Sequence, residues 1–197
     1  VYNCEDVEHY DYNPEKSKEI LEASGCEMGD DGFYYRDGEK VGFVISVSAG
    51  DQVRIDMAQI AAQELKKIGM DVSVEIPAQT DWAGQMAFLI GWGSPFDADD
   101  HTYKVFGTDK GANYSSYSNE DVDKYLTEAR QSDDPEVRKE AYANFQKALA
   151  EDPAYAMICY IDANYVADSN IKGIDPDTIM GHHGVGIFWN VADWTIE

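Results

Sequence analysis

The sequence predicts an α/β fold in which helices flank a mixed sheet, and three observations support this. Apolar residues recur at three- and four-residue spacing over residues 51–68, which predicts a helix. Apolar and polar side chains then alternate over residues 71–76, which predicts a half-buried strand. Asp37-Gly38 lies between two β-prone runs and suits a type I′ turn, so residues 33–43 are predicted as a hairpin that continues through Val44 to Val47. A helix that leads directly into a strand indicates a packed α/β layer.

The remaining elements follow from local start and stop signals. Asn13-Pro14-Glu15 supplies a cap, a proline at the first helical position and an early acid, so a helix is predicted over residues 14–24. Capping signals and apolar periodicity also predict further helices and strands. These are helices over residues 119–131 and 135–150, a strand over 86–91, and a long apolar strand over 155–166 that contains Cys159 as a buried thiol.

Charge and composition exclude several classes of protein. The chain has 197 residues and 44% hydrophobic content, which is enough to bury one core. Its formal net charge of -23 would repel DNA, RNA and anionic membranes. The longest apolar stretch, residues 86–92, is far shorter than the roughly 20 residues that a membrane span needs.

The three cysteines show no CxxC and no spacing typical of a metal site. Cys4 and Cys26 flank the first predicted helix. We expect them to lie close enough to bridge under oxidising conditions if the N-terminal arm runs back along that helix.

No sequence motif of a hydrolase, a phosphate-binding loop or an EF-hand occurs. His182 and His183 are adjacent and would point in opposite directions on an extended chain, which favours a hydrogen-bonded loop over a metal site. The acidic run of residues 97–101 has three interpretations: calcium ligands, an acid/base pair, or carboxylates that cap a helix over residues 101–106.

Six ordered motifs resemble those of the family 5 solute-binding proteins, the peptide- and nickel-binding class that includes oligopeptide- and dipeptide-binding proteins. Each motif is weak alone, but their order makes them jointly specific from residue 12 to the end of the chain. They are Tyr12 to Gly25, Leu65 to Val72, Ile90 to Gly93, Asp97 to Asp99, Tyr117 to Asp123, and Arg138 to Asp152.

The resemblance implies the C-terminal lobe of a type II (class C) periplasmic-binding-protein-like fold. Residues 1–13 would be an arm from the preceding lobe or hinge, 14–185 the ligand-binding lobe, and 186–197 a segment that returns toward the N-terminal lobe. The family implies a monomeric, noncatalytic protein without cofactor or metal, which binds a peptide or similar small solute and delivers it to an ABC permease. It also implies an extracellular or periplasmic location and a lipoprotein-type anchor at the N-terminus.

The resemblance also points to the ligand-facing residues, which are Trp92, Ser94, Phe96 and Asp97, with Tyr160 on the long strand. Trp92 and Phe96 would offer flat apolar contact, and Asp97 would pair with an ammonium group. In peptide-binding members an aspartate three residues after the tryptophan has this role, whereas here that position is Pro95. The tryptophan, Phe96 and Tyr160 have core packing as their alternative role.

Two other classes of function stay open from the sequence. One is a secreted acidic hydrolase that uses Asp97, Asp99 or His182. The other is a surface interaction module without a small-molecule ligand.

Overall fold

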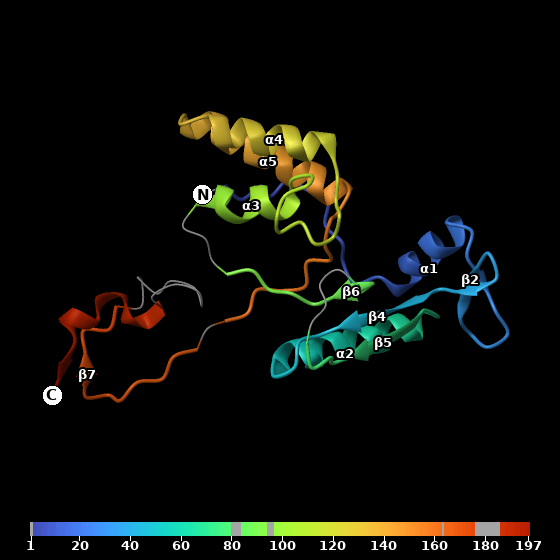
Figure 1. Cartoon of the computed structure of the whole chain (residues 1–197), viewed down its shortest axis with the longest axis horizontal. Helices are drawn as coiled ribbons and strands as arrows, with labels where there is room; N and C mark the ends of the chain where they lie inside the picture. The colour runs from blue at the N-terminus through green and yellow to red at the C-terminus, as the bar shows by residue number, and fades with distance from the viewer. Residues whose placement is uncertain (1, 80–83, 94–96, 163, 176–185) are drawn as a thin grey trace. The chain divides into compact units, whose positions relative to one another are not determined.

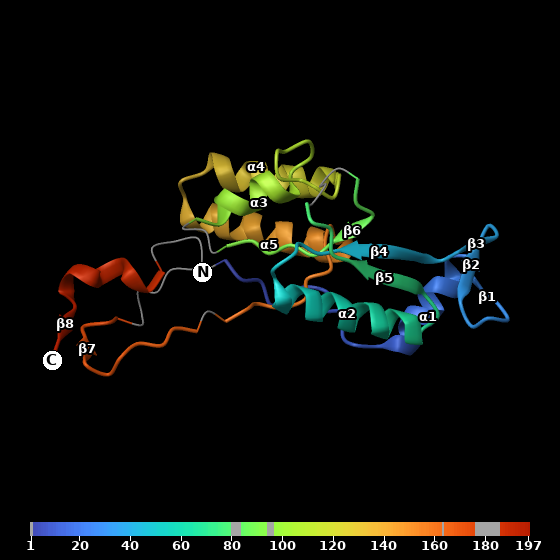
Figure 2. The ribbon, with the colours of Figure 1, turned by 60° about the horizontal axis from the view of Figure 1, so that its bottom comes forward.

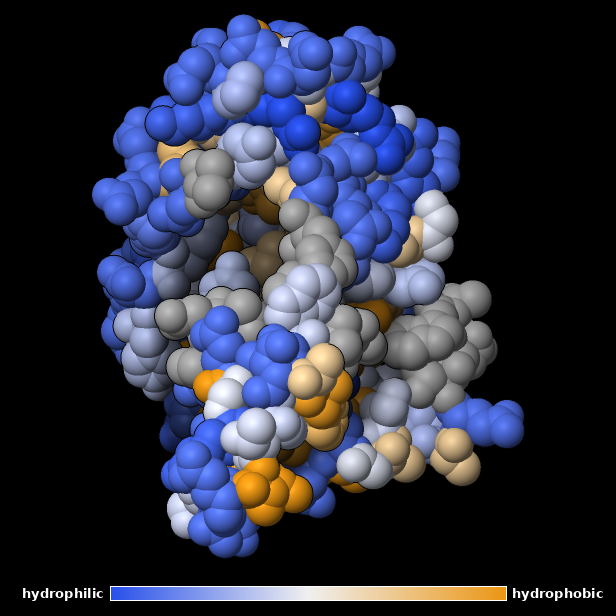
Figure 3. All heavy atoms as spheres, turned by 90° about the vertical axis from the view of Figure 1, so that its left-hand side faces the viewer, coloured by the Kyte–Doolittle hydropathy of each residue, from blue (hydrophilic) through white to orange (hydrophobic). Residues whose placement is uncertain are grey.

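The computed structural model describes residues 2–79, 84–93, 97–162, 164–175 and 186–197, with the side chains of 186 and 187 left aside. The chain forms two compact units, one of residues Tyr10–Gly91 and one of residues Val1–His9 with Trp92–Glu197 (Figures 1 and 2). None of the helices in the described residues is both long and apolar enough to span a membrane. Figure 3 shows one face of the molecule, where hydrophilic residues form much of the surface, as the net charge of -23 leads one to expect.

In its described residues, the unit Tyr10–Gly91 contains two helices and two small sheets. The helices match the predicted ranges within one residue at each end, and each begins at the side chain that caps it, Asn13 or Asp51. The elements are α1 Pro14–Ala23, β1 Glu27–Met28, β2 Tyr34–Arg36, β3 Glu39–Lys40, β4 Gly42–Ser46, α2 Gln52–Lys67, β5 Asp71–Glu75 and β6 Ala87–Phe88.

The Asp37-Gly38 hairpin is confirmed, but it ends earlier than predicted. Arg36 pairs with Glu39 across a two-residue turn in which Asp37 and Gly38 have φ of 53° and 83°, as a type I′ turn requires. The hairpin joins β2 and β3 of an antiparallel sheet, β1-β2-β3, and does not continue through Val47. Instead, β4 leaves this sheet and pairs in parallel with β5 and β6.

The parallel sheet β5-β4-β6 and helix α2 form the predicted α/β layer. Helix α2 joins β4 to β5 and packs its apolar face on the sheet. The buried core consists of Ile45, Val47, Ile55, Ala58, Ala62 and Val72. The strand predicted over residues 86–91 is present but limited to the two residues of β6.

The unit that begins at Trp92 is built on three helices, α3 Ala98–Phe106, α4 Glu120–Gln131 and α5 Pro135–Glu151. The predicted helices over 119–131 and 135–150 are confirmed, and α4 and α5 form a helical hairpin on which α3 packs. Its buried core consists of Val122, Leu126, Ala129, Ala141, Tyr142 and Phe145. A short ladder of β7 Ile171–Lys172 and β8 Thr195–Ile196, with the 3-10 helix Gly186–Asp193 between them, completes the described part.

The long strand predicted over residues 155–166 is wrong. Described residues 156–162 and 164–168 are in neither a helix nor a strand, and every one of them is exposed. A strand needs a neighbouring chain for its backbone hydrogen bonds, and β7 and β8 pair with each other instead. Cys159 lies in this segment and is exposed, so the prediction that it is buried is also wrong.

The expected bridge between Cys4 and Cys26 is not formed either, since both are free thiols and Cys26 is buried. The arm contacts α5. The Cys4 N–H donates to Gln146 Oε1 at 3.1 Å, and the ring of Tyr2 lies 4.8 Å from that of Tyr142. These contacts hold the arm to the unit that contains α5.

Candidate functional site

Three of the five predicted ligand residues lie in the described part of the chain, namely Trp92, Asp97 and Tyr160. Ser94 and Phe96 lie outside the described residues, as do His182 and His183. Within the described residues, no group of three or more His, Cys, Asp or Glu side chains is placed to hold a metal ion.

Trp92 is a partly exposed aromatic residue supported by two other rings. Its side chain is 37% exposed, so it is neither fully in the core nor fully in solvent. The ring of Tyr114 is stacked on it with 6.1 Å between centroids and 11° between planes, and His101 lies 5.7 Å away. These two rings hold the indole in one orientation while part of its surface stays accessible for apolar contact.

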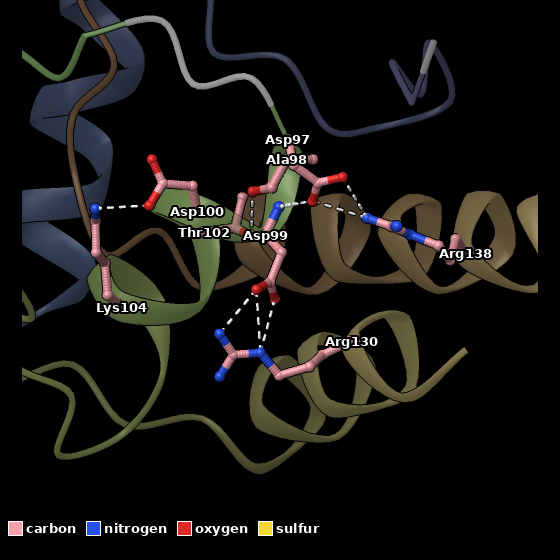
Figure 4. A network of polar contacts seen from close by, with 8 residues as sticks. All are labelled: Asp97, Ala98, Asp99, Asp100, Thr102, Lys104, Arg130 and Arg138. Carbon is pink, nitrogen blue, oxygen red and sulfur yellow. Dashed lines mark hydrogen bonds and ion pairs between the residues drawn. The ribbon is translucent and has the colours of Figure 1, made fainter. Parts of the chain in front are cut away.

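Asp97 is the N-cap of α3, which confirms that the acidic run caps a helix, but this helix begins at Ala98 and not at the predicted residue 101. Its Oδ1 accepts from the N–H of Asp99 at 2.9 Å. Its carboxylate also accepts from Arg138 Nη2 at 2.8 and 3.0 Å (Figure 4). The pKa of Asp97 lies below its ordinary value, because the Asp99 N–H and the Arg138 guanidinium favour the charged form and outweigh partial burial.

The other two acids of the run are paired as well. Asp99 accepts from Arg130 Nε at 3.0 Å and from Nη2 at 2.8 Å, and the Arg130 guanidinium lies 3.7 Å from the centroid of the Tyr103 ring. Asp100 accepts from Lys104 Nζ at 3.0 Å one turn along α3 (Figure 4). Two arginines, one from α4 and one from α5, therefore clamp the first turn of α3 onto the helical hairpin.

Tyr160 lies away from any strand or helix, with its side chain fully exposed. The strand on which Tyr160 was expected to lie is not formed there. The role of Tyr160 in ligand binding stays a prediction. The structure therefore brings together Trp92 and His101, and separately Asp97 and Arg138, but gives Tyr160 no packed environment.

A polar cluster that the sequence interpretation missed lies at the carboxyl end of the parallel sheet. Ser46 ends β4 and is 2% exposed, and its hydroxyl is in hydrogen-bond contact with the side chains of Glu75, which ends β5, and Gln85. Carboxyl ends of parallel strands are the common place for ligand sites in α/β proteins. The signal was available, because Ser46 and Glu75 are each the next-to-last residue of a predicted β run, the one that ends at Val47 and the one that ends at Ile76.

We expect Asp97→Ala to lower the free energy of unfolding by about 1 kcal/mol, because the helix loses its cap. Asp97→Asn keeps the cap oxygen and loses only the ion pair, so the expected loss is at most about 1 kcal/mol. Because the pKa of Asp97 is lower when folded, the ion pair stabilises the chain above about pH 4, and its contribution is lost as pH falls through the folded pKa. Urea titrations of the wild-type chain and both variants at pH 7 and pH 3 measure these free energies of unfolding.

Asp100→Ala serves as the control, since Asp100 contacts Lys104 and His101 within α3 and forms no cap. A loss in Asp100→Ala equal to that in Asp97→Ala would contradict the assignment of the cap to Asp97.

Comparison with known sequences connects this arrangement to a family. Residues 2–154 match the model of the bacterial extracellular solute-binding proteins, family 5 Middle. Protein XP55 of Streptomyces lividans is 35% identical over 162 residues, which cover 79% of this chain and 30% of that protein.

Two solved structures have the same fold. NikZ from Campylobacter jejuni, in complex with Ni(L-His), is 35% identical and aligns over 98% of this chain and 41% of its own, with a TM-score of 0.86. The oligopeptide-binding protein AppA of Bacillus subtilis is 28% identical over 201 aligned positions, 96% of this chain and 36% of AppA. Its structure with a nonapeptide aligns with a TM-score of 0.76. The chain thus spans about a third of the length of the curated relatives that it matches.

Proposed function

The chain belongs to family 5 of the bacterial extracellular solute-binding proteins, and on that premise we propose that it is part of a protein that binds a small solute for an ABC importer. The main support for this proposal is the fold that this chain shares with NikZ over 98% of its length, at 35% sequence identity. The fold is one lobe of the type II (class C) periplasmic-binding-protein-like architecture. The solute would be captured outside the cytoplasm and passed to a membrane permease.

The pairing of the acidic residues supports a binding role over the acidic hydrolase. A general acid or base needs a carboxyl group that is available to the substrate. Asp97 and Asp99 each hold an arginine guanidinium, Arg138 or Arg130. Both carboxylates therefore have a role in the fold that an acid/base residue would have to give up.

Two solute classes are supported, a peptide and a nickel complex with a small organic ligand. AppA is described with a nonapeptide and NikZ with Ni(L-His). The net charge of -23 favours a solute that is neutral or cationic. Of the two, the nickel complex has the stronger support, since identity to NikZ is higher over nearly the whole chain.

We assign ligand contact to Trp92 and the two predicted positions after it, Ser94 and Phe96. Asp97 is better suited to position α3, because an ammonium group would have to displace Arg138 from its carboxylate. The longer protein would act as a monomer. An N-terminal lipid anchor would hold it at the membrane, on the side that faces away from the cytoplasm.

The test is a thermal-shift panel on the longer protein that contains this chain. The probes are Ni²⁺ with L-histidine, a nonapeptide and a pentapeptide, with Ni²⁺ alone, L-histidine alone and EDTA-treated samples as controls. At 100 times its Kd a ligand adds about 2.7 kcal/mol to stability, which raises the melting temperature by several degrees. A rise with Ni²⁺ and L-histidine together, absent with either alone, supports the nickel complex. Cleavage of either peptide would contradict a binding role.

A further inference from the structure

Residues 2–6, called the arm below, are tied to helix α5 by polar contacts. Gln146 Nε2 donates to the backbone carbonyl of Tyr2 at 2.6 Å. Lys147 Nζ donates to the carboxylate of Asp6 at 2.8 Å. Although the arm precedes the whole of the other unit in the sequence, it belongs to the same compact unit as the candidate site.

Arg138 of α5 lies between the arm and the start of α3. Its guanidinium carbon is 5.6 Å from the centroid of the Tyr2 ring, which is within the range of a cation–π contact. Through Nη2 the same guanidinium donates to both carboxylate oxygens of Asp97, at 2.8 and 3.0 Å (Figure 4). The ring of Tyr142 lies 5.8 Å from the guanidinium and 4.8 Å from the ring of Tyr2. A planar guanidinium held by rings and a carboxylate has a fixed place that a lysine would not reproduce.

The contacts continue from Asp97 to Trp92 through α3. Asp97 caps this helix, and a helix that loses its cap is loosened at its start. The start of α3 carries His101, whose ring lies 5.7 Å from that of Trp92. Tyr2, Arg138 and the cap of α3 thus form a continuous series of contacts that ends at the indole.

We propose that Tyr2 and Arg138 are positioning residues for solute binding. The arm, through Arg138 and the cap of α3, holds the indole of Trp92 in the orientation that accepts the solute. If only a fraction of the molecules has the indole in that orientation, the apparent affinity for the solute falls by the same fraction. The effect on affinity rests on the proposed function, whereas the effect on the position of the indole does not.

Arg130 provides an internal comparison. It pairs with Asp99 at 2.8 Å, and its guanidinium carbon lies 3.7 Å from the centroid of the Tyr103 ring, so in the described residues its charged and ring contacts are with α3. Both arginines therefore hold the start of the same helix, but Arg138 is the one that also contacts the arm. Because Arg130 stays in place when the arm is altered, we expect the effect of the arm to be partial.

Fluorine NMR of the longer protein, labelled with 5-fluorotryptophan, tests the positioning without any solute. Trp92→Phe identifies the resonance of Trp92. We expect Tyr2→Leu, which keeps apolar bulk but removes the ring, to shift or broaden this resonance, and Tyr2→Phe, which keeps the ring, to leave it unchanged. Asp6→Asn is the control, because it breaks the ion pair with Lys147 and leaves Tyr2 in place. A Trp92 resonance that is identical in wild type, Tyr2→Leu and Arg138→Lys would overturn the proposal.

A double-mutant cycle on affinity tests whether Tyr2 acts through Arg138 or contacts the solute itself. The probe is Ni²⁺ with L-histidine, titrated calorimetrically into the longer protein, with circular dichroism to show that each variant is folded. Tyr2→Leu alone should weaken binding at least about threefold. In the Arg138→Lys background the same change should weaken it by less than about 1.5-fold. In the Arg130→Lys background it should keep its effect of about threefold.

The outcomes separate this proposal from the proposed function. An equal effect of Tyr2→Leu in the wild type and in Arg138→Lys would mean that Tyr2 acts by another route, which contradicts the proposal. A changed Trp92 resonance with unchanged affinity would restrict Tyr2 to a structural role and overturn its role in binding. If the wild-type protein does not bind the nickel complex, the preferred solute is wrong, and the NMR comparison alone decides whether the arm positions Trp92.

Discussion

Gly42→Ala is expected to prevent the parallel sheet from forming in its present register. Gly42 starts β4 and pairs with Asp71 of β5, and a Cβ at this glycine would collide with the Asp71 carbonyl and its neighbouring backbone atoms. Backbone atoms cannot move aside by a rotamer change, so the strands must separate. We expect the free energy of unfolding to fall by more than about 3 kcal/mol, measured by urea denaturation followed by circular dichroism.

Gly111→Ala is the matched control. A Cβ at Gly111 meets no atom within 4 Å, and the backbone there is not left-handed. This variant should keep its stability within about 0.5 kcal/mol. Similar stability of Gly42→Ala and Gly111→Ala would contradict the close strand pairing at Gly42.

Leu126→Ala is expected to destabilise the other unit by about 2–5 kcal/mol. Leu126 is 1% exposed and lies in the core between α4 and α5. Its removal leaves a cavity that the two helices cannot close without losing their packing. Val137→Ala on α5 is the comparison, because Val137 is 45% exposed and alanine favours the helix. Unfolding that changes equally in both variants would mean that the helical hairpin is not the core of its unit.

The helices were predictable because their ends depend on side chains close in sequence. Asn119 accepts from the N–H groups of Asp121 and Val122, and Asp134 accepts from that of Glu136. A cap and the periodic face that follows it lie within one short stretch of chain, so no distant residue is needed to recognise them. The hairpin at Asp37-Gly38 follows from the same local logic.

The wrong predictions concern segments whose contact partners lie far away in the sequence. Strand composition at residues 155–166 indicates burial, but it does not say which chain supplies the neighbouring strand. Likewise, β4 continues an apolar run from the hairpin, yet it pairs with β5 and β6, whose paired residues lie 29 and 42 positions further along the sequence. The predicted proximity of Cys4 and Cys26 depends only on the helix between them, whereas contacts with α5, such as that of Gln146, hold the arm.

In the candidate site, too, features that depend on neighbouring residues were predictable and features that depend on distant residues were not. The cap formed by Asp97 is local and was among the interpretations that the sequence allowed. Its ion pair joins residues 41 positions apart, so Arg138 was not recognised as the group that holds this carboxylate. The support of Trp92 by Tyr114 depends likewise on a loop distant in sequence.

The most direct test of the central claim is a calorimetric titration of the longer protein with the solute that stabilises it best, Ni²⁺ with L-histidine or a peptide. We expect saturable binding of one solute per protein molecule, after which mass spectrometry recovers the solute chemically unchanged. Trp92→Ala should weaken this binding at least tenfold, or about 1.4 kcal/mol, while the protein stays folded. Absence of heat with every solute, or recovery of a converted product, would contradict the assignment of this chain to a solute-capturing protein.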